Sequence, residues 1–209
     1  MIITQENIRD LLKAITDDFE KNKEELCGYD RAIGDGDHGD SMARGTRDGY
    51  RAVMELPFDS SVFECIKVYS RTMLSTIGGA IGPIFSTVIM ELGRAAKATN
   101  QIGATEYVTG LKNAAKKVMD LGGAQVGDKT LVDALVPAAD TAAKNSDKSL
   151  EEIALLAEKA AGEGVTATIS MQAKMGRSHF LREKSIGHQD AGATSLYYML
   201  RTISEFVNR

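Results

Sequence analysis

Apolar residues recur at helical spacing along most of the chain. In residues 5–23 they stand at Ile8, Leu11, Leu12, Ile15 and Phe19, the i, i+3, i+4, i+7 pattern of an amphipathic helix. The same spacing predicts seven more helices, at about residues 40–56, 60–77, 83–96, 105–121, 131–144, 149 onward and 196–207. Because no segment alternates convincingly with a period of two, we expect no β-strand, and the predicted fold class is all-α.

Local signals mark where several of these helices begin, end or bend. Ser149 and Glu152 have the spacing of a capping box at the start of the seventh helix. Pro83 suits the first turn of the fourth helix, and Pro137 predicts a kink in the sixth. The end of the seventh helix stays open, because glycines stand at 162 and 164.

Glycine-rich polar loops follow the first, third and fifth predicted helices and precede the eighth. They cover residues 30–41, 78–83, 122–130 and 175–192. In an antiparallel up-and-down bundle, alternate connections lie at the same end. The count therefore predicts that these four loops surround one mouth of the bundle.

Composition narrows the class of protein. With 209 residues the chain fits one domain, and its net charge of −4, with both signs mixed, argues against a nucleic-acid surface. Cys27 and Cys65 are too few for a disulfide framework and form no zinc motif. The absence of a signal-like N-terminus and of a long apolar run predicts a cytoplasmic protein that does not enter a membrane.

One segment, residues 30–40, holds four carboxylates and three glycines. Glycine and like charges both disfavour a helix interior, so we expect the whole segment to be a loop. Asp30, Asp35 and Asp37 are hard oxygen donors, which suit Mg²⁺ or Ca²⁺ rather than zinc. A solvated acidic turn is the alternative, but the flanking glycines favour a loop that binds metal. Three carboxylates can hold two Mg²⁺ ions against the phosphates of a nucleotide.

Three better-known loop motifs match this chain only formally. The glycines at 34, 36 and 39 have dinucleotide-fingerprint spacing, but no strand precedes them and aspartates stand between them. An EF-hand would need a glutamate where Thr46 stands. Residues 122–130 resemble a Walker A loop with Asp128 inserted before Lys129, again without a preceding strand.

Other polar groups are candidates for phosphate contacts. The 78–83 turn leads into a helix N-terminus, whose N–H groups either bind phosphate or only close a tight turn. His38 stands next to a candidate metal ligand, so it contacts a phosphate or a group bound to the metal, or it is an ordinary exposed histidine. The basic residues of the last loop either close over a nucleotide or stay solvated; they are Arg177, Arg182, Lys184 and His188.

Four motifs together resemble the nucleotide-binding L subunits of dihydroxyacetone kinases. They lie, in the same order, at residues 30–39, 78–83, 127–130 and 182–190. The resemblance spans essentially the full length. It implies one nucleotide-binding L domain over residues 1–209, folded as an eight-helix antiparallel up-and-down barrel with ADP or ATP and two Mg²⁺ ions at one end. It matches Asp30, Asp35 and Asp37 to the metal ligands. Positions that match nucleotide contacts are His38, Gly39, Asp40, Ser41, Ala80, Ile81, Gly122, Leu131, Arg177, Asp190, Ala191 and Gly192.

The resemblance also implies a reaction and partners. The bound nucleotide would carry a phosphoryl group from a phosphohistidine on an M subunit of the phosphoenolpyruvate phosphotransferase system to dihydroxyacetone on a K subunit. The chain ends at Arg209 without a K domain, which favours this free-standing type over a fused, ATP-exchanging kinase. A homodimer stays open.

Ile81, Ser41 and Ala191 depart from common family residues. Alternatives are therefore a kinase for another small ketose, such as a four-carbon one, or a nucleotide-binding regulatory module without turnover.

Overall fold

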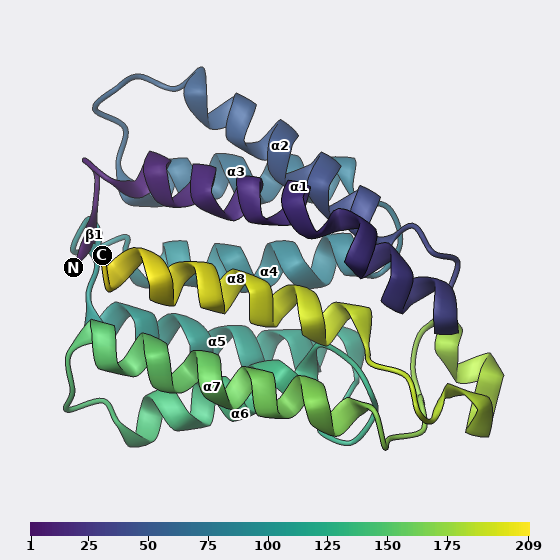
Figure 1. Ribbon diagram of the computed structural model, residues 1–209. Helices are drawn as coiled ribbons and strands as arrows, with labels where there is room; N and C mark the ends of the chain where they lie inside the picture. Colours follow the sequence, from purple (N-terminus) through teal and green to yellow (C-terminus); the bar gives the residue numbers. More distant parts are fainter.

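The computed structural model describes all residues, 1–209, and is almost entirely helical (Figure 1). Eight α-helices and one 3₁₀ helix follow one another along the chain: α1 (Ile8–Ile33), α2 (His38–Met54), α3 (Val62–Thr76), α4 (Ile81–Ala95), α5 (Ala104–Gly122), α6 (Val132–Lys144), α7 (Leu150–Thr168), η1 (Arg177–Ser185) and α8 (Ala191–Val207). The predicted all-α class and the count of eight α-helices are confirmed.

The α-helices form a closed ring. Each packs against its neighbours in sequence, and α8 returns to pack against α1. Neighbouring helices run in opposite directions, so the α1–α2, α3–α4, α5–α6 and α7–α8 connections gather at one end, on the right in Figure 1. The mouth predicted by counting loops is therefore present.

One hydrophobic cluster of 49 buried residues draws on every α-helix. Phe19 of α1 meets Phe85 of α4 edge to face, with ring centroids 5.7 Å apart. Helices α6 and α7 approach closely because small residues line their contact. At Gly164, an added Cβ would lie only 2.1 Å from the Asp133 carbonyl oxygen. Because the interior of the ring is apolar, a polar ligand site is expected at one of its ends.

The expectation that residues 30–40 form one loop was wrong. Helix α1 continues to Ile33 and α2 begins at His38, so only residues 34–37 are non-helical. Leu26, Cys27 and Ile33 extend the buried stripe of α1 past its predicted end. Their packing outweighs the roughly 1 kcal/mol that Gly28 costs a helix.

The expectation of no strand was wrong for two short segments. Strand β1 (Ile3–Thr4) pairs antiparallel with β2 (Gln101–Ile102), Ile3 opposite Ile102. Two residues are too few to show an alternating pattern. The last loop also contains η1, which follows Gly176 and is followed by Ile186 and Gly187; both glycines have positive φ. The predicted capping box is confirmed, since Ser149 accepts from the Glu152 N–H, and α7 continues through Gly162 and Gly164.

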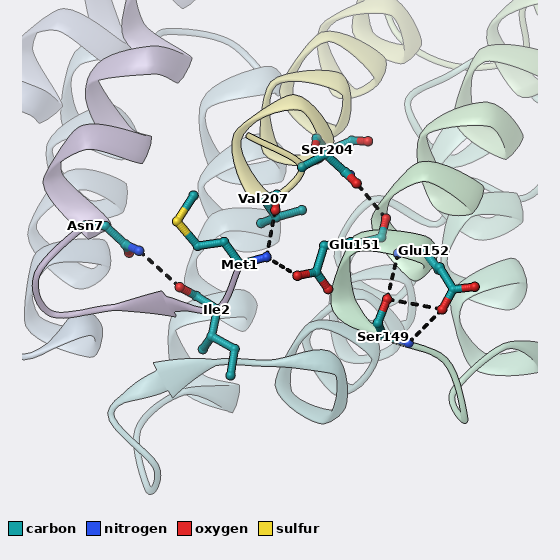
Figure 2. A network of polar contacts seen from close by, with 9 residues as sticks. Met1, Ile2, Asn7, Ser149, Glu151, Glu152, Ser204 and Val207 are labelled. Carbon is teal, nitrogen blue, oxygen red and sulfur yellow. Dashed lines mark hydrogen bonds and ion pairs between the residues drawn. The ribbon is translucent and has the colours of Figure 1, made fainter.

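The end of the ring away from the mouth is tied by polar contacts around Met1 (Figure 2). The Met1 amine donates to the Val207 carbonyl oxygen (2.7 Å) and pairs with Glu151. These contacts join β1 to the end of α8 and the start of α7, opposite the mouth. None of the helices combines the length and apolar character needed to cross a bilayer.

Candidate functional site

Three carboxylates converge at the mouth between α1 and α2. Asp30, Asp35 and Asp37 each present an oxygen, and these oxygens lie within 4.8 Å of one another. Asp30 is half-buried, while Asp35 and Asp37 are exposed. The donor set is all oxygen and open to solvent, which fits a hard cation such as Mg²⁺ that keeps part of its water.

Asp30 also shapes the loop that carries the other two aspartates. Its Oδ2 accepts backbone N–H groups from Gly36 (2.8 Å), Asp37 (3.0 Å) and His38 (3.3 Å). Gly34 leaves room for this carboxylate, because an added Cβ would lie 2.2 Å from Asp30 Oδ1. Asp30 Oδ2 is therefore occupied by backbone hydrogen bonds, while Oδ1 accepts none and can bind a cation.

The 3₁₀ helix η1 reaches the acidic loop through one side chain. Arg177, its first residue, forms an ion pair with Asp35. Arg182, Lys184 and His188 are exposed and form no ion pair. Of the four basic residues of the last loop, only Arg177 forms an ion pair with the acidic loop.

Helix α2 starts against α1 and α8. At Gly39 an added Cβ would lie 1.8 Å from the Lys23 carbonyl oxygen, so only glycine permits this approach. The alternative of an exposed His38 was wrong, since only 8% of the residue is exposed. Its Nε2 hydrogen-bonds Ser195 Oγ of α8. Burial lowers the pKa of His38 to about 4, so the ring is neutral at pH 7.

The α3–α4 turn presents free backbone donors. Ala80 precedes α4, no side chain caps the helix, and Ile81 is half-exposed. The first N–H groups of a helix lack intrahelical acceptors, so they can donate to an anion at the mouth. Gly82 packs tightly there, since an added Cβ would lie 2.3 Å from the Ile77 carbonyl oxygen.

The α5–α6 loop is organised by Asp133 and Lys129, neither of which was a candidate site residue. Asp133 accepts N–H groups from Gly127 (2.6 Å) and Thr130 (2.7 Å). Lys129, 1% exposed and with φ of 60°, donates to the carbonyl oxygens of Thr168 (2.5 Å) and His188. A lysine inside a glycine-rich motif was the available signal, but nothing in the sequence marked it as buried.

Lys129 thereby ties its loop to the start of α8. Asp190 caps α8, accepting the Ala193 N–H on Oδ1 (2.7 Å), and its own N–H donates to Thr168 Oγ1 (3.0 Å). Desolvation raises the pKa of Asp190 to about 6, although nearby Lys129 opposes the shift. An added Cβ at Gly192 would lie 3.7 Å from the Leu131 N atom, so these two segments adjoin.

The structure therefore brings most of the candidate residues to one end. The aspartate cluster is ion-paired with Arg177, and His38 is hydrogen-bonded to Ser195 in α8. Gly192 lies next to Leu131. Gly122 ends α5 beside Ile84 of α4. Asp40 is exposed, whereas the Ser41 N–H donates to the Asp37 carbonyl oxygen (3.0 Å) and its hydroxyl accepts from Arg44.

Comparison with known proteins adds three findings. The family model of the DAK2 domain matches residues 32–205. The chain is 36% identical over 208 residues to the PEP-dependent dihydroxyacetone kinase, ADP-binding subunit DhaL, of Escherichia coli (strain K12), covering 98% of each chain. It is 30% identical over 188 residues to the D-erythrulose kinase of Mycolicibacterium smegmatis, covering 88% of this chain and 32% of that one.

Solved structures share the fold. The dihydroxyacetone kinase of C. freundii in complex with AMP-PNP and Mg²⁺ superposes with a TM-score of 0.74 at 20% identity. The match covers 95% of this chain and 33% of that chain. The ring of helices therefore corresponds to one part of a larger kinase.

Proposed function

Since this chain belongs to the DAK2 domain family, we propose that it is the nucleotide-binding subunit of a dihydroxyacetone kinase. In this role its ADP or ATP carries a phosphoryl group from a phosphohistidine on an M subunit of the phosphotransferase system to dihydroxyacetone on a K subunit. The supporting observation is the convergence of Asp30, Asp35 and Asp37 within 4.8 Å at the mouth. Similarity to DhaL over 98% of the chain gives the reaction type.

The aspartates are proposed to hold two Mg²⁺ ions, which supply charge neutralisation for the nucleotide phosphates. The free N–H groups at the start of α4 offer donors for phosphate oxygens, and Arg177 adds a positive charge beside the cluster. The proposed nucleotide contacts are His38, Gly39, Asp40, Ser41, Ala80, Ile81, Gly122, Leu131, Arg177, Asp190, Ala191 and Gly192. Because every α-helix contributes to one core, residues 1–209 are treated as a single nucleotide-binding domain.

A four-carbon ketose is a second candidate acceptor. The D-erythrulose kinase is 30% identical to this chain, so the same nucleotide site can serve different sugars in different proteins. In the proposed complex the sugar is held by the K subunit and not by this chain. The acceptor is therefore a property of the partner that this chain joins.

Reconstitution tests the proposal. The purified chain is combined with K and M subunits, the general phosphotransferase proteins and phosphoenolpyruvate, with dihydroxyacetone or erythrulose as acceptor. We expect phosphorylated ketose, and none when Asp35→Ala replaces the wild-type chain. Asp147→Asn, an exposed carboxylate in the α6–α7 connection, serves as the matched control. A folded, ADP-loaded chain that supports no transfer would identify a regulatory module instead.

A further inference from the structure

Ser195 lies behind His38 and is not among the proposed nucleotide contacts. It is fully buried in α8 and bonds two partners: its Oγ lies 2.9 Å from the Ala191 carbonyl oxygen and also contacts His38 Nε2. The two side chains are separated by 157 positions in sequence. The contact therefore joins the first residue of α2 to the second turn of α8, beside the aspartate cluster.

The serine has one hydroxyl hydrogen, and the carbonyl oxygen can only accept. If the hydrogen points to the Ala191 carbonyl, Ser195 Oγ accepts a hydrogen from Nε2–H, and both contacts are hydrogen bonds. If the hydroxyl hydrogen points to the His38 ring instead, Ser195 Oγ and the Ala191 carbonyl oxygen lie 2.9 Å apart with no hydrogen between them. In a site closed to water, that unpaired contact is costly. The geometry therefore selects Nε2–H.

The other ring nitrogen remains accessible. The only fully buried side-chain polar atoms without a partner are the hydroxyl oxygens of Ser86 and Tyr107. His38 Nδ1 makes no hydrogen bond within the chain and is not one of these atoms. It therefore keeps some solvent-exposed surface, at the end of α2 that faces the mouth.

Building on the proposed function, on which this step rests, we infer that Ser195 is a positioning residue that holds His38 as the Nε2–H tautomer. Nδ1 then faces the mouth as a hydrogen-bond acceptor. An acceptor repels a phosphate oxygen, so its partner is an O–H group: a ribose hydroxyl of the nucleotide, or a water bound to its metal. His38 would thus orient the ligand without contacting a phosphate through Nδ1.

Nitrogen-15 NMR of the histidine rings reads the tautomer directly. The chain has three histidines, and the spectrum of His38→Gln identifies the signals of His38. In wild-type protein we expect Nε2–H alone for His38, whereas the exposed His179 and His188 exchange between tautomers. A wild-type His38 with its proton on Nδ1 overturns the inference.

Binding of Mg²⁺ and ADP, measured by calorimetry, tests the consequence. Ser195→Ala should give mixed tautomers at His38 and weaken binding about fivefold, as expected for one lost hydrogen bond. Ser204→Ala, another buried serine at the far end of α8, should change neither. His38→Asn can offer an acceptor near Nδ1, so it should retain more affinity than His38→Gln, which offers an amide near Nε2. Unchanged tautomer and affinity in Ser195→Ala would refute the positioning role.

Deoxy-ADP separates the two sources of the O–H group. If the effect of Ser195→Ala disappears with 2′-deoxy-ADP or 3′-deoxy-ADP, the donor is that ribose hydroxyl. If it persists with both, the donor is metal-bound water, and both results support the acceptor role. A wild-type chain that binds ADP but shows Nδ1–H refutes only this inference. A chain that binds no nucleotide refutes the proposed function, while the tautomer can still be read.

Discussion

At the scale of single residues, the three aspartates have different tasks. Asp30 accepts three backbone N–H groups and so builds the loop, whereas Asp35 and Asp37 are exposed and make no comparable contacts with the backbone. The sequence identified all three as one cluster of oxygen donors. It could not rank them, because the loop-building hydrogen bonds depend on where α1 ends.

Asp35→Ala and Asp30→Ala should therefore separate ligand binding from stability. With EDTA present, Asp35→Ala should unfold within about 0.5 kcal/mol of wild type, because it loses only a surface ion pair. Asp30→Ala should lose about 1–3 kcal/mol, because three N–H groups lose a charged acceptor. Urea unfolding gives these values, and calorimetry should show Mg²⁺-dependent ADP binding abolished in both. Equal stability of the two variants would contradict the separate tasks.

Asp190 should make stability depend on pH. Its folded pKa of about 6 lies above its ordinary 3.8, so the folded state binds the proton more tightly. The contribution of Asp190 to the free energy of unfolding is complete below about pH 4 and is lost as the pH rises through 6. Asp190→Asn keeps an oxygen to cap α8 but does not titrate.

Urea unfolding in EDTA at pH 5 to 8 measures this effect. The advantage of Asp190→Asn over wild type should grow with pH and approach about 1–3 kcal/mol. His38, whose pKa is lowered to about 4, acts in the opposite direction, because it destabilises the fold as pH falls below 6.5. Comparing the two proteins at each pH cancels that contribution. An advantage that does not vary with pH would show that Asp190 does not titrate in this range.

At the scale of elements, glycine decides which helices can touch. Gly28 lies in α1 with no atom within 4 Å of an added Cβ, while Gly164 of α7 faces the Asp133 carbonyl of α6. The sequence shows both as glycines within helical stretches. Only the packing shows that Gly28 weakens α1 without any gain, whereas Gly164 permits the close contact of α7 with α6.

The two glycines should respond oppositely to alanine. Gly28→Ala should stabilise the protein by about 0.5–1 kcal/mol, because it restricts the unfolded chain and improves helix propensity. Gly164→Ala should destabilise it by at least about 1–3 kcal/mol, because α6 and α7 must separate. Since Asp133 anchors the 127–130 loop, ADP affinity should fall as well. Denaturant unfolding and calorimetry measure both, and a neutral Gly164→Ala would show that the helices can shift freely.

At the scale of the whole molecule, the sequence predicted the helices and the mouth because both follow from periodicity and counting. It did not predict Lys129 buried against Thr168 and His188, nor Ser195 behind His38. These contacts join segments far apart in sequence, so they become visible only when the helices are packed. The β1–β2 pair was missed for a different reason, since its two-residue strands are too short to show an alternating pattern.

Ring closure also means that a ligand at the mouth stabilises the entire fold. The proposed nucleotide contacts come from the connections between α1 and α2, α3 and α4, α5 and α6, and α7 and α8, so unfolding any of these helices disrupts the site. At a ligand concentration 100 times Kd, binding to the folded state alone adds about 2.7 kcal/mol, which raises Tm by about 5–10 °C in a chain of this size.

Thermal unfolding should therefore show one transition that moves upward with Mg²⁺ and ADP together. Neither ADP with EDTA nor Mg²⁺ alone should reproduce the full shift, because the aspartates and the phosphates are both negative and need the cation between them. Asp35→Ala should unfold at the wild-type apo Tm whatever is added, whereas Asp147→Asn should respond like wild type. If ADP raised Tm equally with EDTA, the nucleotide would be held without the aspartate cluster, and the metal-dependent site would be wrong.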